Sequence, residues 1–205
     1  MKKYVKLISL MLVVTTMAMM LTGCSATKKA ETTVHSAFAA LKALDFEKAS
    51  EYLDVDEIMN TDDENDTLSL DDNVFMETLF GRLDYEIISS EEIDENTVVV
   101  KTRISAVDMK PVLGEFFGKA LQYAFASAFA NPKPSDEEMN RKMEEMFVEC
   151  ASKEDLEMVT NEVDIRVIQV DKKWKIELGD TLSDALLGGL AKAAEEISNA
   201  FNSAN

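Results

Sequence analysis

An acidic segment of the chain has a spacing close to that of a calcium-binding loop. Asp62, Glu64 and Asp66 stand one, three and five positions into it, where such a loop places oxygen ligands. Thr67 occupies the position that requires a glycine for the sharp turn, and Asn73 occupies the position of the bidentate glutamate. The segment therefore fails as a calcium site. We predict a solvated acidic loop, and neither a metal nor another cofactor.

Two residues have side chains that are typical of catalysis, but their surroundings predict other roles. His35 is the only histidine, and its neighbours Val34 and Phe38 belong to an apolar helical face, which leaves position 35 exposed. Cys150 lies on the methionine-rich face of a predicted helix, which is typical of a core cysteine. No general base accompanies the thiol. We assign no catalytic residue.

Three polar residues interrupt otherwise apolar strand faces and are the candidate ligand pocket. They are Tyr85, Thr102 and Asn161. Such groups can orient a ligand if the sheet encloses a cavity. The alternative is that they are ordinary hydrogen-bonded residues of the core, and that interpretation is the favoured one.

The N-terminus carries chemistry of a different kind. Lys2, Lys3 and Lys6 precede an apolar stretch over residues 7–20, which is shorter than the roughly 20 residues of a membrane-spanning helix. The stretch ends in Leu21, Thr22, Gly23 and Cys24, which resembles the lipobox of bacterial lipoproteins. This resemblance implies a signal peptide over residues 1–23 and a diacylglyceryl group on Cys24. Two acyl chains hold a protein stably on a membrane.

The expected address is therefore extracytoplasmic, with lipid on Cys24 as the contact with the cell membrane. Without residues 1–23 the chain keeps 18 basic and 39 acidic residues, a net charge of −21. A surface of this charge repels nucleic acid and anionic head groups. Lys28 and Lys29 are the exception, because they lie close behind the anchor and can contact head groups. A solvated linker over residues 24–30 is the equally supported alternative.

The elements that must position these residues follow from hydrophobic periodicity. Apolar residues at helical spacing predict helices around residues 34–44, 46–53, 72–80, 112–130, 135–150 and 182–201. Alternating residues predict strands around residues 85–89, 98–104, 159–167 and 174–178, with a hairpin loop over 91–96 and a tight turn at Asp171 and Lys172. The segment from Asp54 to Asp72 is predicted as a loop.

These elements predict one α+β domain over residues 31–205. N-terminal helices pack on a curved antiparallel sheet of about four strands, with an inserted helical hairpin and a C-terminal helix. The first helix of the hairpin is apolar almost all round, so we expect it to be buried on several sides. Gly188 and Gly189 weaken the C-terminal helix. With Cys24 lipidated, Cys150 has no partner for an intramolecular disulfide.

Residues 39–49, with Asp45, Phe46 and Ala49 at the start of the second helix, resemble the opening of nuclear transport factor two-like domains of bacterial lipoproteins. The hairpin that ends in residues 171–176 is similar to the terminal strands of these domains, and the segment 182–190 is similar to a group of such lipoproteins from Gram-positive bacteria, mostly of unknown function. The resemblance implies a cone-shaped α+β fold and carries no catalytic motif. The fold hosts enzymes and binding modules alike.

The leading functional hypothesis is a non-catalytic, membrane-anchored module that binds a small molecule, a peptide or an envelope component. No glycine-rich phosphate loop, serine elbow or usable carboxylate pair supports an enzyme. Two alternatives remain: an enzyme with a pocket in the concave face of the sheet, and a structural partner of another envelope protein. The first needs an enclosed cavity, and the second needs an exposed apolar patch.

Overall fold

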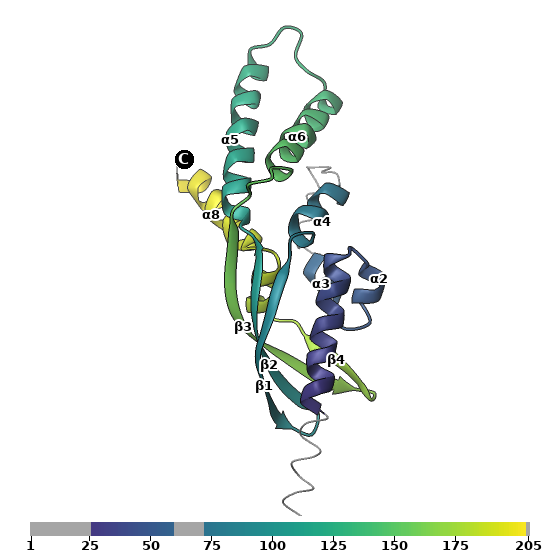
Figure 1. The fold of residues 1–205 in the computed structure, drawn as a ribbon. Coiled ribbons are helices and arrows are strands. Elements are labelled where there is room, and N and C mark those ends of the chain that lie inside the picture. The colour runs from purple at the N-terminus through teal and green to yellow at the C-terminus, as the bar shows by residue number, and fades with distance from the viewer. Residues whose placement is uncertain (1–25, 60–71, 204–205) are drawn as a thin grey trace, which may run out of the picture.

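The computed structural model describes residues 26–59 and 72–203 (Figure 1). The calcium-like segment around Asp62 and the lipobox residues lie outside the described residues. The described elements are a helix over residues 26–42, α2 (Phe46–Ala49), α3 (Val55–Met59), α4 (Asp72–Phe80), β1 (Asp84–Asp94), β2 (Thr97–Val107), α5 (Met109–Ala128), α6 (Asp136–Ala151), β3 (Met158–Val170), β4 (Lys173–Glu177), α7 (Asp180–Leu186) and α8 (Leu190–Ser203).

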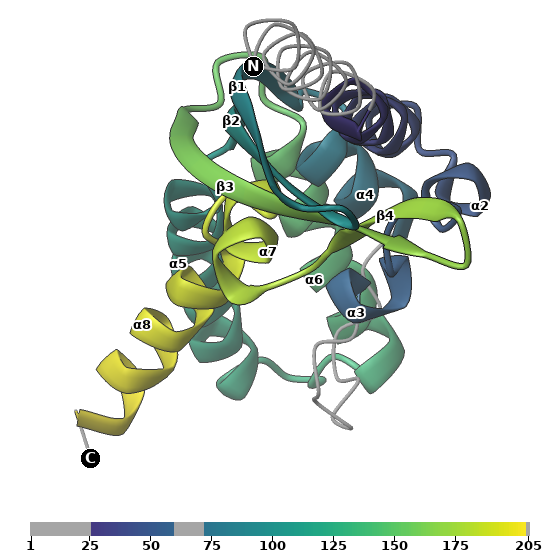
Figure 2. The ribbon, with the colours of Figure 1, turned by 90° about the horizontal axis from the view of Figure 1, so that it is seen from below.

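The four strands form one antiparallel sheet in the order β1-β2-β3-β4. The sheet is strongly curved, as the arc of β3 shows in Figure 2. The predicted alternation is confirmed on β2, where Val98, Val100 and Ile104 are fully buried and Lys101 and Arg103 are exposed. The predicted α+β class is therefore confirmed, with helices covering one face of the sheet.

The turn between β1 and β2 is tighter than the sequence suggests, and the turn between β3 and β4 is as predicted. β1 continues to Asp94, so the hairpin loop comprises residues 95 and 96 and not the predicted 91–96. The loop was overestimated because exposed acidic residues of an edge strand resemble loop residues. Asp171 and Lys172 confirm the predicted tight turn, and both have positive φ angles, 50° and 67°. This is the backbone of the turns that suit the twist of a hairpin.

The predicted linker over residues 24–30 is wrong in its C-terminal part. Residues 26–30 belong to the first helix, and Ala30 is fully buried in the core. The polar residues of this segment lie on the exposed side of the helix, which made the segment resemble a linker. Asp45 caps α2 as predicted, since its carboxylate accepts a hydrogen bond from the Lys48 amide at 3.1 Å.

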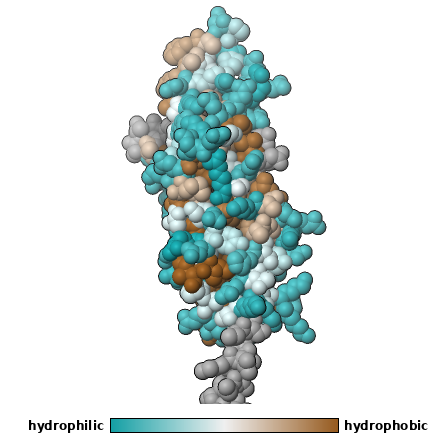
Figure 3. Space-filling model, viewed as in Figure 1, coloured by the Kyte–Doolittle hydropathy of each residue, from teal (hydrophilic) through white to brown (hydrophobic). Residues whose placement is uncertain are grey.

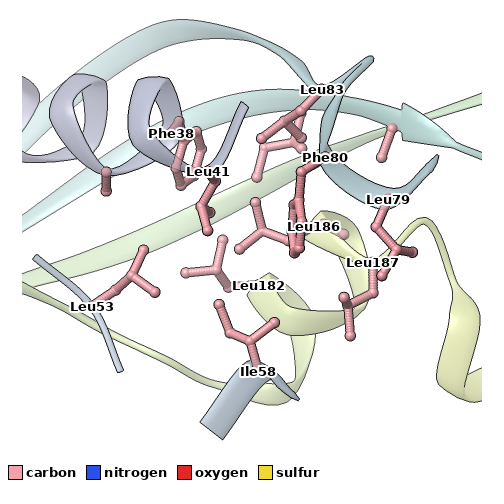
Figure 4. Packing of buried hydrophobic residues seen from close by; sticks show 14 of the residues in the cluster. Phe38, Leu41, Leu53, Ile58, Leu79, Phe80, Leu83, Leu182, Leu186 and Leu187 are labelled. Carbon is pink, nitrogen blue, oxygen red and sulfur yellow. The ribbon is translucent and has the colours of Figure 1, made fainter. Parts of the chain in front are cut away.

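The predicted loop over residues 54–72 contains α3. Val55 and Ile58 of this short helix are buried, 8% and 5% exposed. Two apolar residues three apart were too weak a signal among the acidic residues around them. The helix adds Ile58 to the core, where it lies beside Leu182 of α7 (Figure 4).

One hydrophobic core lies between the sheet and the helices that cover it. Phe38 and Leu41 come from the first helix, Phe80 from α4, and Leu182 and Leu186 from α7 (Figure 4). All five side chains are at most 4% exposed. Helices from segments that are far apart in the sequence thus cover the same concave face of the sheet.

The helical hairpin of α5 and α6 projects beyond the sheet, at the end opposite to residue 26 (Figure 1). Ser135 and Glu138 form a capping box at the start of α6. The expectation that α5 is buried on several sides is wrong for its outer half. Leu121 is 45% exposed and Phe125 is 63% exposed. Only the base of the helix reaches the core, through residues such as Phe116.

The predicted C-terminal helix is two helices. Gly188 and Gly189 have φ angles of 58° and 76°, which end α7 and redirect the chain into α8. The amide of Met109 donates to the carbonyl of Gly188 at 3.0 Å, so this break is fixed against the start of α5. None of the helices among residues 26–59 and 72–203 is long and apolar enough to cross a bilayer.

Candidate functional site

The structure brings the three predicted pocket residues onto one face of the sheet. Tyr85 and Asn161 both pair with Ile104, from the strands on either side of β2, and Thr102 lies two residues before Ile104 on β2. This face is the one that the helices cover. Thr102 is fully buried, and its hydroxyl donates to the carbonyl of Val100 at 3.3 Å.

Tyr85 is half-buried and has a partner that the sequence did not predict. Its hydroxyl lies 2.9 Å from Nδ1 of the exposed His35, and its ring contacts Phe38 edge-on at 5.1 Å. Burial, and then the charge of Asp84, raise the pKa of the Tyr85 hydroxyl. Five cavities in the described part of the chain are each lined by residues other than Tyr85, Thr102 and Asn161.

Cys150 lies in the core, where it is 1% exposed. Burial raises the pKa of its thiol, and the nearby Glu115 carboxylate raises it further. Glu115 itself pairs with Lys119 and Lys153. A buried thiol with a raised pKa is a poor nucleophile at neutral pH. The described residues hold no cluster of three or more histidine, cysteine, aspartate or glutamate side chains suited to a metal.

A different cavity, of about 580 Å³, lies beside the start of the first helix. We call it the basic cavity. It is lined by Lys28, Lys29, Thr32, Thr33, Glu51, Tyr52, Lys173 and Trp174. Its volume falls in the range of small-molecule sites in proteins.

Three separate segments build the basic cavity. The first helix supplies Lys28 and Lys29 and, one turn later, Thr32 and Thr33. The hydroxyls of these two threonines donate hydrogen bonds to the carbonyls of the two lysines, at 2.8 and 3.0 Å. The segment after α2 supplies Tyr52, whose carbonyl accepts from the amide of Ile176 at 2.7 Å. That bond fixes Tyr52 against β4.

The remaining lining residues come from β4. Lys173 directly follows the tight turn and pairs with Val170, and Trp174 pairs with Gln169. The backbone of the turn therefore determines where this lysine and this indole are placed. Trp174 is half-buried and packs against the core.

The basic cavity carries a positive net charge, whereas the whole chain carries a negative one. Lys28, Lys29 and Lys173 bring three positive charges and Glu51 brings one negative charge. Within residues 26–59 and 72–203, these three ammonium groups take part in none of the ion pairs, and they line one cavity together. Unpaired lysines around one cavity attract an anion.

Trp174 adds an aromatic surface and an unused donor. Its indole N–H is inaccessible to solvent, and no described residue accepts a hydrogen bond from it. A buried donor without a partner costs on the order of 1–3 kcal/mol.

Sequence reasoning found only part of this site. The sequence indicates Lys28 and Lys29 as lysines that can contact head groups, but it does not indicate that they lie in a helix. The sequence does not indicate that Tyr52 belongs to a site, because a single tyrosine after a short helix forms no recognisable motif. Lys173 and Trp174 were interpreted as ordinary alternation in a strand. Only the tertiary fold shows that these residues share a cavity.

Comparison with known proteins gives one partial structural similarity. No family model matches the chain. No curated protein matches it. Among solved structures, a chain described as "a putative lipoprotein (ycdA) from Bacillus subtilis" is similar over 55% of this chain, with 18% sequence identity and a TM-score of 0.41. The match spans 35% of that protein's length. The resemblance to nuclear transport factor two-like domains stays a prediction from the sequence.

Proposed function

We propose that this chain is an extracytoplasmic lipoprotein whose domain binds a phosphate-bearing anion in the basic cavity. The observation that carries the proposal is the set of three unpaired lysines around Trp174 and Tyr52. The rest of the chain is strongly acidic, so an anion has few other places to bind. Lysine ammonium groups act as point charges for phosphate, and they need no particular orientation of it.

The position of the cavity supports a ligand at the membrane surface. Lys28 is four residues after Cys24, the residue that the lipobox resemblance assigns to the lipid. Lysine, tryptophan and tyrosine are also the residues that gather at the interface between a membrane and water. A phosphate could come from a lipid head group or from a free small molecule, and the chemistry of recognition is the same.

The membrane address is tested by removing the lipid acceptor. For the Cys24→Ser variant we expect loss of lipid attachment and release of most of the protein from the membrane fraction, because the acidic domain has no other strong membrane contact. Metabolic labelling with a fatty acid and fractionation of cells measure both effects. The matched control is Cys150→Ser, which keeps the N-terminal cysteine and should remain labelled and membrane-bound. Unchanged retention of Cys24→Ser would overturn this part of the proposal.

Ligand binding is tested through Trp174, which is the only tryptophan in the chain and therefore reports on the cavity by itself. The probes are dihexanoyl phosphatidylglycerol, dihexanoyl phosphatidylcholine and inorganic phosphate, each below micelle-forming concentration. We expect a saturable change of Trp174 fluorescence with phosphatidylglycerol. Since a lysine near a charged surface contributes ~1 kcal/mol, replacing Lys28, Lys29 and Lys173 with glutamine should weaken binding roughly 100-fold.

The control carries the same change in net charge away from the cavity, with glutamine at Lys42, Lys48 and Lys133. It should bind like the original chain. A response to inorganic phosphate alone would identify a free anion as the ligand, whereas a response limited to phosphatidylglycerol would identify a lipid head group. No saturable response to any probe would overturn the binding proposal and leave the result for Cys24 untouched.

A further inference from the structure

One acidic residue lies among the three lysines of the basic cavity. Glu51 is exposed and lines this cavity together with Lys28, Lys29 and Lys173. Within the part of the chain that the structure describes, its carboxylate forms an ion pair with none of these lysines. Figure 3 shows hydrophilic and neutral side chains over the lower right part of the molecule, where the first helix begins. The basic cavity therefore holds positive and negative groups that do not neutralise each other by direct contact.

The aromatic residues of the basic cavity favour a cation near Glu51. Tyr52 directly follows Glu51, and its carbonyl accepts a hydrogen bond from the Ile176 amide at 2.7 Å. This bond holds both residues beside β4, the strand that supplies Trp174 to the same cavity. The face of a tyrosine or tryptophan ring attracts a cation. A carboxylate and two aromatic rings thus provide surroundings that stabilise an ammonium group.

Thr32 adds a hydrogen-bond acceptor to the lining of the basic cavity. Its hydroxyl already donates its proton to the carbonyl of Lys28 at 2.8 Å, so only the lone pairs of the oxygen remain for a ligand. A phosphate oxygen needs a donor and gains nothing from this group, whereas an ammonium group can donate to it. Thr32 therefore favours a ligand charge of the same sign as Glu51 does.

We propose that the ligand of the basic cavity is a phosphate ester that also carries an amine, of the phosphoethanolamine class. This inference rests on the proposed function, because it adds a second charge to the phosphate that the lysines bind. The phosphate lies among the three lysines, and the ammonium group lies near Glu51 and the two aromatic rings. An ammonium group donates charge-assisted hydrogen bonds to a carboxylate, which are stronger than bonds between neutral groups.

The alternative is that Glu51 only lowers the positive charge of the basic cavity. In that case its carboxylate repels every phosphate ligand, and its removal strengthens the binding of all of them. If the carboxylate instead binds an ammonium group, its removal weakens the binding of ligands with an amine and strengthens the binding of phosphates without one. The two interpretations therefore predict opposite signs for the effect of one substitution on an amine-bearing ligand.

The test is Glu51→Gln in the full chain, with Trp174 fluorescence as the readout. The probes are dihexanoyl phosphatidylethanolamine and dihexanoyl phosphatidylethanol, which lacks the amine, each below micelle-forming concentration. Glu51→Gln should weaken binding of the first about fivefold, the upper value for an exposed ion pair, and strengthen binding of the second about twofold. Glu47→Gln is the matched control, because this exposed glutamate lies one turn earlier and outside the lining of the cavity. It should leave the binding of both probes unchanged.

A second variant tests the aromatic contribution. Tyr52→Leu should weaken binding of phosphatidylethanolamine about threefold, with a smaller effect on phosphatidylethanol, and Tyr52→Phe should recover most of that affinity because it keeps the ring.

Free O-phosphoethanolamine, as a third probe, separates the two sources of the ligand. Binding of this probe alone would support a soluble ligand, and binding of phosphatidylethanolamine alone would support a head group. If Glu51→Gln binds phosphatidylethanolamine as tightly as the original chain, or more tightly, the inference is overturned, while the phosphate site of the proposed function stands. If neither lipid probe nor O-phosphoethanolamine gives a saturable response, the proposed function fails and the inference fails with it.

Discussion

Gly188→Ala is expected to destabilise the protein by about 3 kcal/mol or more, in the upper part of the range for single substitutions. A Cβ atom at this position would lie 1.8 Å from the carbonyl oxygen of Val107, which is far inside van der Waals contact. The φ angle of 58° adds the cost that a side chain pays in the left-handed region. The contact atom is backbone, so it cannot move aside like a flexible side chain. Relief requires the α7–α8 connection to separate from the end of β2, which also breaks the hydrogen bond from Met109 to Gly188.

The free energy of unfolding, from urea titration followed by circular dichroism, measures this effect. Gly189→Ala is the matched control, because its φ angle of 76° is equally unusual but no atom lies within 4 Å of the added Cβ. It should cost only the roughly 1–2 kcal/mol of the backbone conformation. Equal losses for the two variants would mean that close packing against Val107 contributes nothing.

Phe147→Ala is expected to cost roughly 3–5 kcal/mol, the usual loss for a large buried aromatic side chain. Phe147 is fully buried, and its ring contacts Phe116 of α5 at 5.7 Å and Phe75 of α4 at 5.7 Å between centroids. The side chain therefore joins three helices at the base of the projecting hairpin. Its removal leaves a cavity where the hairpin meets the rest of the core.

Two measurements separate local from global effects. Urea unfolding gives the total loss in the free energy of unfolding. Hydrogen exchange should show the largest gain in amide exchange within α5 and α6, because the other helices stay packed on the sheet. Phe129→Ala removes the same atoms from a side chain that is 87% exposed, and should change stability by less than about 0.5 kcal/mol in dilute solution. Similar losses for Phe147→Ala and Phe129→Ala would contradict the packing described for the hairpin base.

The sheet was the most predictable part of this fold. Because one face of β2 and β3 is buried and the other is wet, apolar and polar residues alternate along both strands, and the alternation fixes which side faces the core. The tight turn at Asp171 and Lys172 was also predictable, since it separates two alternating runs directly. Element boundaries were less accurate where exposed acidic residues continued a strand or a helix.

The role of α5 could not be predicted from its sequence. Leu121 and Phe125 are as apolar as Phe116, and periodicity does not distinguish a side chain that packs in the core from one that projects at an outer surface. Only the length of the helix relative to the sheet decides which of its apolar side chains reach the core and which lie at the outer surface. Likewise, the basic cavity joins residues near positions 28, 52 and 173, and no local pattern connects segments so far apart.

The first helix already includes residue 26, which lies two positions after Cys24, and this limits how far the basic cavity can move from an anchored lipid. Two residues span at most about 7 Å, so a lipidated domain would lie within the thickness of one head-group layer of the bilayer. Short tethers raise the effective concentration of a ligand to millimolar values. A cavity held there would be about half occupied even with a dissociation constant of about 1 mM, which corresponds to roughly −4 kcal/mol. Weak, exchangeable contacts would then orient the whole molecule on its membrane, with the hairpin of α5 and α6 as the far end.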